Sequence, residues 1–270
     1  MTGYARTAPP HITSSESVPK MMWMTAAALV PQAAVSLFFW RFDAVRILGI
    51  SLLSGLGAGV LARWLFHQKA SLRDGSLFVL ALLFGLMLPP STPTGAAAVG
   101  SFAAIFLGRE IFGGHGANPF HPAVTGLVLL RHCFPGAAST PAPLSFETAS
   151  IVALGIGGAV LLWQKLIRWE IPLFYLAVLY AVSRFAGPDF PIQFLSGALG
   201  FAAFFLVTDP VTTPLTRTGQ RMFAAGAAGL AVFLRHGLPQ DQALWSSLLI
   251  MNAAVPWMDR WVRPKGSYRR

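Results

Sequence analysis

Long uncharged stretches alternate with short charged segments along the whole chain. A helix needs about 20 apolar residues to cross a membrane. The stretch 75–108 is too long for one crossing, and the proline-rich run Pro89–Gly95 in its middle cannot continue a helix. With that stretch split in two, the pattern predicts an all-α polytopic membrane protein with about ten transmembrane helices. The stretches free of Asp, Glu, Lys and Arg are 21–40, 47–62, 75–108, 111–130, 148–164, 171–183, 190–208, 222–234 and 242–258.

Composition supports the membrane class and excludes several others. Hydrophobic residues make up 54% of the 270 residues and charged residues only 11%, whereas soluble domains are about a quarter charged. An ordinary soluble enzyme and a disordered chain are therefore both excluded. The single cysteine, Cys133, excludes a disulfide framework and a metal site built of cysteines alone. Residues 1–20 are polar, and we expect them to form a cytoplasmic arm that precedes an uncleaved first span.

The distribution of positive charge predicts the orientation. The chain has 20 Lys and Arg residues against 10 Asp and Glu residues. If the N-terminus lies inside and the spans alternate, the outer segments hold only Arg41, Arg46, Arg131, Arg184 and Arg235, and the other 15 lie inside. Cytoplasmic loops carry such an excess, so both termini are expected in the cytoplasm, with a basic tail over 263–270.

Two pairs of similar segments suggest an internal repeat. The run Leu88–Gly95 resembles Thr208–Pro214, and Asn118–Pro122 is echoed by Asn252–Pro256. They indicate two five-helix halves, 21–134 and 148–262, joined by an outer loop at 135–147. Because five is odd, the halves have opposite orientations, as in transporters whose broken helices meet near the midplane. The alternative is that two proline-interrupted apolar stretches simply look alike.

The segment Gly108–Ala123 is the most unusual of the chain. Its four glycines and two prolines cannot form a regular helix. Irregular backbone at membrane depth must be buried in protein or line a cavity, where its free N–H and C=O groups could hold a ring, a phosphate or an ion. The alternative is a cytoplasmic loop leading into the fifth span.

Other polar and aromatic residues allow a functional and a structural interpretation. Asp209, at the edge of a long uncharged run, could bind a cation or accept a proton, or it could cap a turn before Pro210. The histidines show no metal-ligand spacing, so we expect hydrogen-bonded or solvated side chains and no metal site. The tryptophans near span ends are typical of an interfacial belt. The histidines are His115, His121, His132 and His236, and the tryptophans are Trp40, Trp64, Trp163, Trp169, Trp257 and Trp261.

Taken in order, these segments resemble the RnfD/NqrB family, whose members are integral membrane flavoprotein subunits of the Rnf and Na⁺-translocating NADH:quinone oxidoreductase complexes. The resemblance runs almost from end to end and is closer to RnfD, because Asn118-Pro119-Phe120 and the short N-terminus suit that branch. The most specific matches are Phe112-Gly113-Gly114, Asn118-Pro119-Phe120, Pro122-Ala123, Thr208-Asp209-Pro210-Val211-Thr212 and Gly219; further matches are Pro9-Pro10-His11-Ile12, Asp74-Gly75-Ser76, Leu88-Pro89-Pro90, Glu147-Thr148, Ile171-Pro172, Asn252, Pro256, Asp259 and Arg263-Pro264.

The resemblance implies a subunit of an ion-translocating electron transport complex in the bacterial inner membrane. It implies FMN or riboflavin as cofactor, partner subunits in the membrane and at its surface, and no nucleic acid. Family members carry FMN esterified to a threonine in a Ser-Gly-Ala-Thr motif of the outer loop. Here only Ser139-Thr140-Pro141 resembles that motif, so Thr140 is the candidate for covalent attachment. The residues expected to frame an interior flavin site are Gly113, Gly114, Asn118, Pro119, Phe120, Asp209, Thr212 and Thr213.

Two other functions remain open from the sequence. An inverted repeat could bind a small solute or ion at the midplane and transport it. Alternatively, the chain could be a structural component of such a complex that carries no cofactor. No phosphate-binding loop, serine-hydrolase elbow or zinc-protease motif occurs in the sequence, so a catalytic centre of the soluble type is not expected.

Overall fold

The computed structural model describes residues 17–67, 74–136, 143–186 and 196–262, and all regular secondary structure among them is helical. The predicted all-α class is confirmed. The elements are α1 (Val18–Phe66), α2 (Ser76–Leu86), α3 (Thr94–Phe106), the 3₁₀ turn η2 (Glu110–Phe112), α4 (Pro122–Cys133), α5 (Leu144–Trp163), α6 (Glu170–Ala186), α8 (Gly197–Phe201), the π-helical turn η3 (Ala202–Leu206), α9 (Arg217–Leu234) and α10 (Gln240–Val262).

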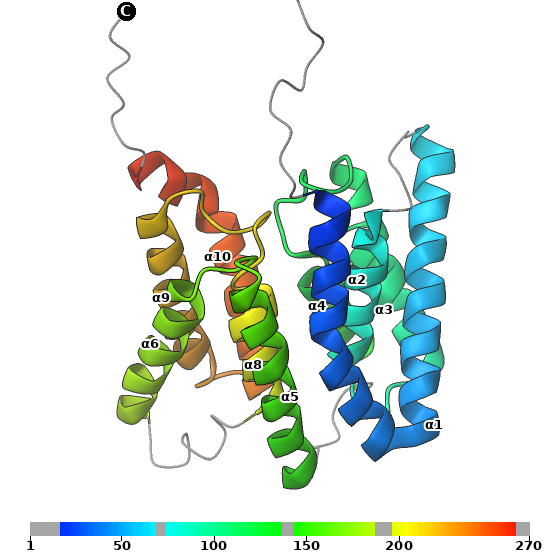
Figure 1. The fold of residues 1–270 in the computed structure, drawn as a ribbon, viewed down its shortest axis with the longest axis horizontal. Coiled ribbons are helices and arrows are strands. Elements are labelled where there is room, and N and C mark those ends of the chain that lie inside the picture. The colour runs from blue at the N-terminus through cyan, green and yellow to red at the C-terminus, as the bar shows by residue number, and fades with distance from the viewer. Residues whose placement is uncertain (1–16, 68–73, 137–142, 187–195, 263–270) are drawn as a thin grey trace, which may run out of the picture.

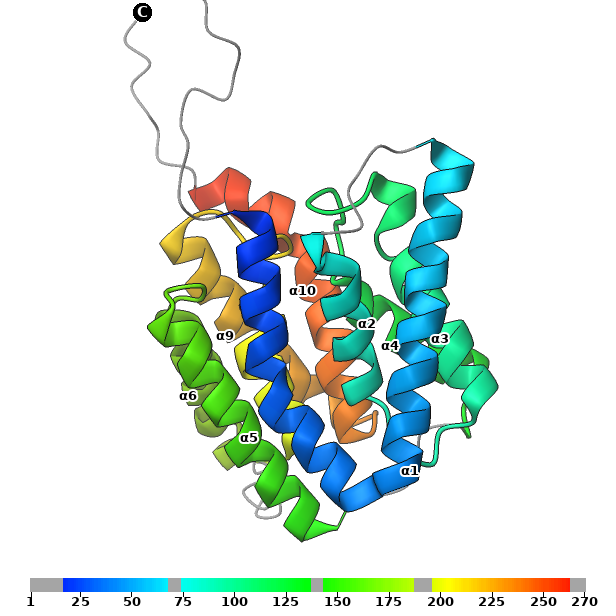
Figure 2. The same cartoon turned by 45° about the vertical axis from the view of Figure 1, so that its right-hand side comes forward.

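Helix α1 is two arms joined by a sharp reversal. Arg41 has φ 41° and ψ −111°, which are not helical values, and the chain turns back there, so the two arms form a V (Figure 2). The arms correspond to the predicted spans 21–40 and 47–62. Pro31 lies inside the first arm, where it removes one backbone hydrogen bond.

Several helices are shorter than a membrane is thick. Helices α2, α3 and α4 have 11, 13 and 12 residues, against about 20 for a full crossing. The predicted break at Pro89–Gly95 is confirmed, because α2 ends at Leu86 and α3 begins at Thr94. The predicted helical stretch 111–130 is wrong in its first third, since α4 begins only at Pro122. Gly113, Gly114 and Gly116 all have positive φ angles, which a helix excludes.

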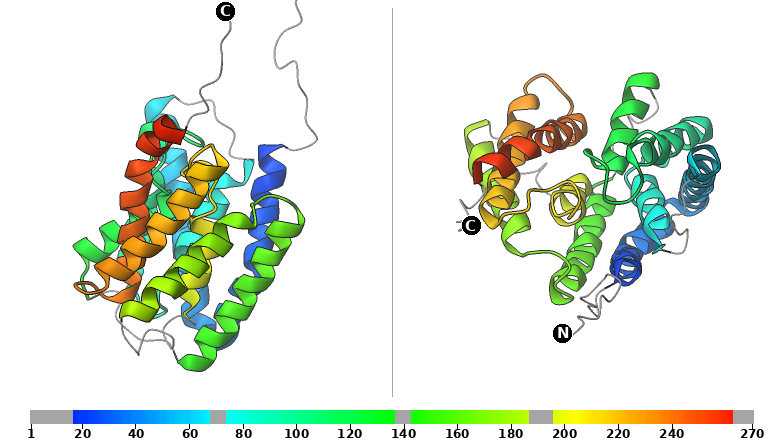
Figure 3. Two further views of the ribbon diagram at one scale, coloured as in Figure 1. Left: turned by 90° about the vertical axis from the view of Figure 1, so that its left-hand side faces the viewer. Right: turned by 90° about the horizontal axis from the view of Figure 1, so that it is seen from above.

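The helices form two groups side by side. Helices α1 to α4 make one group and α5 to α10 the other (Figures 1 and 3), and the groups meet where α1 packs on α5 and α4 on α10. We call the end of the bundle that carries Val18 and Val262 the inner end, and the opposite end, where Arg41 lies, the outer end. Within the described residues, three helical segments are long and apolar enough to cross a membrane: Val18–Phe66, Thr94–Phe112 and Leu144–Trp163.

Glycines set the contact between the two groups. A Cβ atom on Gly157 would lie 2.2 Å from the carbonyl oxygen of Ala28, and one on Gly158 would lie 2.4 Å from the Phe204 ring. Helices α1 and α5 therefore cross with their backbones in direct contact. Gly155, on the same helix, has no atom within 4 Å of its Cβ position, so it plays no part in that crossing.

Candidate functional site

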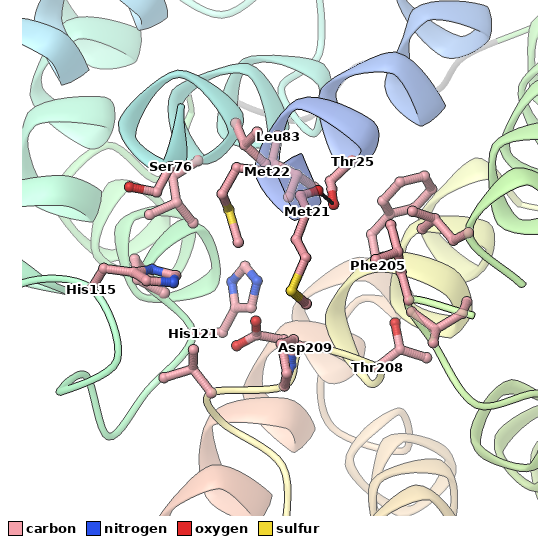
Figure 4. Close-up of a pocket in the computed structure, with 18 of the residues that line it drawn as sticks. Met21, Met22, Thr25, Ser76, Leu83, His115, His121, Phe205, Thr208 and Asp209 are labelled. Atoms are coloured by element: carbon pink, nitrogen blue, oxygen red, sulfur yellow. Dashed lines mark hydrogen bonds between the residues drawn. The ribbon is translucent and has the colours of Figure 1, made fainter. Parts of the chain in front are cut away.

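A small cavity near the inner end brings the two unusual sequence segments together. Its walls come from the start of α1, from α2, from the loop before α4, from the end of α5 and from the segment after η3 (Figure 4). Asn118 and Asp209, both predicted to frame an interior site, line it. The cavity volume is about 80 Å³, which leaves room for a few water molecules. Its polar or titratable lining residues are Thr25, Ser76, His115, Asn118, His121, Thr208 and Asp209.

The glycine-rich loop forms one wall of this inner cavity. Asn118 is buried, and its side-chain nitrogen donates to the carbonyl oxygen of Phe120 at 3.0 Å. That bond fixes the approach to Pro122, which opens α4 and suits a first helical position because it needs no N–H partner. The loop is thus an ordered wall of the site, as the functional interpretation expects.

Asp209 stands at the opposite wall and closes a tight turn. Its Oδ2 accepts the Thr212 backbone N–H at 3.2 Å and the Thr212 hydroxyl at 2.8 Å, and its carbonyl oxygen accepts the Thr213 hydroxyl at 2.7 Å. The turn-capping interpretation of Asp209 therefore holds. It does not use up the carboxylate, whose Oδ1 makes no hydrogen bond within the described part of the chain and which lines the cavity.

Asn252, in the middle of α10, joins the two walls. It is 3% exposed. With the amide oriented to satisfy both neighbours, its nitrogen donates to the Thr212 carbonyl oxygen at 3.3 Å and its oxygen accepts the His121 backbone N–H at 3.0 Å. One amide thus ties the loop before α4 to the turn after η3, and both partners are backbone atoms. This link lies at the junction of the two helix groups.

Replacing Asn252 by leucine is expected to loosen that junction. The His121 N–H and the Thr212 carbonyl would remain buried without partners, at a cost of about 1–3 kcal/mol for each unsatisfied group. Thermal unfolding of the purified protein in nanodiscs measures the loss. Gln164→Leu, which removes an exposed amide at the end of α5, is the control. Equal stability of the two variants would contradict the role of the link.

A buried ionic network supports the inner cavity from behind. Arg109 is 2% exposed, and its Nη2 donates to the Ser76 hydroxyl at 2.8 Å. The Ser76 hydroxyl donates in turn to Asp74 Oδ1 at 2.7 Å. Asp74 and Glu110 lie 3.9 Å and 3.6 Å from the guanidinium. Since Ser76 lines the cavity, this network holds one of its hydroxyl groups in place.

A second and larger cavity lies toward the outer end, also between the two helix groups. Its volume is about 980 Å³, at the upper end of the 300–1,000 Å³ typical of small-molecule pockets. Trp40 and Arg131 line it, and Trp40 Nε1 and Arg131 Nε are buried donors without an acceptor in the described residues. Such orphaned donors are costly unless a ligand or water accepts from them. Its aromatic walls are Trp40, Phe146, Phe201 and Trp245.

Polar contacts hold the walls of the outer cavity. Arg131 on α4 pairs with Asp241 on α10 across the two groups. Ser150 on α5 donates to Gln32 Oε1 on α1 at 2.9 Å, and the Glu147 carboxylate accepts the backbone N–H of Gly197. Sequence reasoning missed this cavity. The available signal was Gln32, a lone amide inside the uncharged run 21–40.

The predicted site residues fall into three sets. Asn118 and Asp209 line the inner cavity, whereas Thr212 and Thr213 serve the turn beside it. Gly113, Gly114, Pro119 and Phe120 shape the loop but do not line the cavity. Thr140 lies outside the described residues. Among the residues that the structure describes, no group of three His, Cys, Asp or Glu side chains is placed to hold a metal ion.

Comparison with known proteins gives consistent matches, all to D-type subunits of membrane oxidoreductase complexes. The one from the proton-translocating ferredoxin:NAD(+) oxidoreductase complex of Clostridium ljungdahlii is 28% identical over 94% of this chain and 93% of its own length. The one from the ion-translocating oxidoreductase complex of Methanosarcina acetivorans is 28% identical over 98% and 97%. The one from the Na(+)-translocating ferredoxin:NAD(+) oxidoreductase complex of Acetobacterium woodii is 27% identical over 95% and 92%.

A family model covers nearly the whole chain. The model described as the NQR2, RnfD, RnfE family matches residues 5–145 and 140–267. The matched ranges include both walls of the inner cavity and the residues around the outer one. The chain belongs to the NQR2, RnfD, RnfE family.

Proposed function

We propose that this chain is the D-type integral membrane subunit of an ion-translocating oxidoreductase complex in the bacterial inner membrane. The observation that carries the proposal is the match to D-type subunits over more than nine-tenths of both chains. The chain spans the membrane about ten times with both termini in the cytoplasm, because the excess of Lys and Arg then lies inside. Its partners are the other subunits of the complex.

The two helix groups act as inverted repeats in this proposal. The two arms of α1, then α2, α3 and α4, correspond in order to α5, α6, α8 with η3, α9 and α10. The turns after α2 and after η3 support the correspondence. Thr92 closes the first by donating to the Pro89 carbonyl oxygen at 2.7 Å, and Thr212 closes the second by donating to Asp209. The first turn lies at the outer end and the second at the inner end, as opposite orientations require.

The flavin, if carried, belongs in the outer cavity. The inner cavity of about 80 Å³ is too small for a three-ring system, whereas about 980 Å³ is ample. Trp40 Nε1 and Arg131 Nε are free to donate to ring carbonyl groups, and the aromatic walls offer stacking. Thr140 precedes Leu144, which lines this cavity, by four residues, so its Cα lies within about 14 Å of that residue. A bound flavin would supply one- and two-electron transfer.

The two cavities suggest where an ion crosses. Both lie between the helix groups. They are separated by η3, with Phe201 lining the outer cavity and Phe205 the inner one. A π-helical turn is rare and frequent at functional sites. The relatives include complexes named for protons and one named for Na(+), so the ion is not given by the comparison.

Affinity purification of the tagged chain from its native host tests the complex. Oxidoreductase subunits are expected to co-purify in fixed ratio. A chain that purifies alone and supports solute uptake in proteoliposomes would contradict this proposal and favour a transporter.

Flavin analysis of the same preparation tests the cofactor. Fluorescence on the denatured polypeptide that disappears in Thr140→Ala would support covalent attachment, and flavin only in the supernatant would support a non-covalent site. Trp40→Phe is expected to lower the retained non-covalent flavin several-fold, whereas Trp163→Phe, 80% exposed near the inner end, leaves it unchanged. Absence of flavin from the intact complex would contradict the cofactor assignment and leave a structural role.

A further inference from the structure

The inner cavity holds two imidazoles and one carboxylate inside an otherwise uncharged wall. His115, His121 and Asp209 are the titratable residues that line it, and no Lys or Arg is among the lining residues. The Asp209 carboxylate interacts electrostatically with both imidazoles. Figure 4 shows the His121 ring and Asp209 next to each other at the centre of the cavity, with His115 to one side.

His121 is held so that its ring is available to exchange a proton. The side chain is 3% exposed, and Nδ1 makes no hydrogen bond within the described residues. Its backbone is fixed independently, because the N–H donates to Asn252 and the carbonyl oxygen accepts the Thr125 hydroxyl at 3.1 Å. A buried imidazole with a free nitrogen beside a carboxylate is a natural proton acceptor.

The elements packed around the cavity bring no competing charge. Helix α1 contributes Met21, Met22 and Thr25, and α10 contributes the amide of Asn252 behind the ring. From α2 the polar lining group is Ser76, whose hydroxyl is already shared between Asp74 and Arg109. Asp209 is therefore the counter-charge that a protonated His121 would face.

The same donor set is poor for an alkali cation. Hard cations take several oxygen ligands, and here one carboxylate oxygen is engaged by Thr212. Imidazole nitrogen suits transition metals instead, and the described residues hold no three-ligand cluster for one. A volume of about 80 Å³ suits a few waters, which can relay protons between the side chains.

We propose that His121 and Asp209 form a proton-binding site, reached from the inner end through His115, and that the ion handled in this cavity is a proton. A proton from the inner aqueous phase passes through exposed His115 and cavity water to the His121 ring. The imidazolium is balanced by the Asp209 carboxylate. Transfer of the proton to that carboxylate leaves both groups neutral, and its return to the inner water resets the site. The inference rests on the proposed ion-translocating function and specifies its ion.

Infrared difference spectroscopy of the full chain in nanodiscs, titrated with acid, tests the site. The spectra of the wild type are expected to show an imidazolium signal together with a carboxylate signal. His121→Asn abolishes the imidazolium signal, and His132→Asn, an exposed histidine of α4 near the outer end that bonds the Val128 carbonyl, retains it. Exchanging Na⁺ for choline leaves the midpoint unchanged. Asp209→Asn moves the imidazole midpoint to lower pH, because the counter-charge is removed.

Two results would overturn the inference. One is an imidazolium signal that persists in His121→Asn. The other is a midpoint that shifts with Na⁺ concentration in the wild type, which would indicate a sodium site. If His121→Asn does not fold, the Asp209→Asn shift decides alone, and an unmoved midpoint refutes the pair. Co-purification with oxidoreductase subunits tests the complex separately, so a chain that co-purifies without a titrating pair refutes only the proton site.

Discussion

Replacement of Gly157 by valine is expected to destabilise the protein by about 3 kcal/mol or more, near the upper end of the usual cost of overpacking. A Cβ there would lie 2.2 Å from the Ala28 carbonyl oxygen, a backbone atom that cannot turn aside. Helices α1 and α5 would have to move apart along the contact between the two halves. The measurement is thermal or denaturant unfolding of the purified protein in nanodiscs.

Gly155→Val is the matched control for this variant. It makes the same substitution two residues earlier on α5, at a position with no atom within 4 Å, so it carries the same change in helix propensity without the clash. It is expected to differ little from the wild type. Equal losses in both variants would show that the α1–α5 crossing tolerates separation and that the backbone contact is unimportant.

Replacement of Arg109 by methionine is expected to cost about 3–5 kcal/mol, since removing one partner strands the others as uncompensated buried charges. Arg109 and Glu110 are 2% and 3% exposed, and Asp74 lies 3.9 Å from the guanidinium. Yield of folded protein and unfolding temperature report the loss. Arg184→Met, an exposed position at the outer end of α6, is the control.

The double variant Arg109→Met with Glu110→Gln separates charge from packing. If the loss comes from a stranded carboxylate, neutralising Glu110 is expected to restore part of the stability. A double variant as unstable as Arg109→Met alone would mean that the size and shape of the Arg109 side chain, and not its charge, stabilise this end of the bundle.

Local chemistry explains which parts of the fold could be predicted from the sequence. Proline and glycine act on their own backbone, so the break at Pro89–Gly95 and the irregular loop after Phe112 were visible directly. The start of α4 was misplaced, because an absence of charge identifies an apolar environment but not helical backbone. Asp209 was singled out as an acid in an uncharged run, and the structure places it at a cavity.

The cavities themselves could not be predicted, because distant segments build them. Gln32 and Ser150 are 118 residues apart and share a hydrogen bond at the wall of the outer cavity. Trp40 was assigned to an interfacial belt because nothing nearby in the sequence distinguishes it from Trp163. His121 was expected to be hydrogen-bonded or solvated, whereas its ring is buried with Nδ1 unsatisfied in the described residues. Such differences depend on which helices pack together.

The amide of Asn252 also bears on how this cavity can diversify. It bonds main-chain atoms of residues 121 and 212 and ignores their side chains. Mutations at those two positions can therefore change what the cavity attracts while the joint between the halves persists. Descendants of one ancestral scaffold could in this way acquire different ion preferences by single substitutions, without passing through an unfolded intermediate genotype.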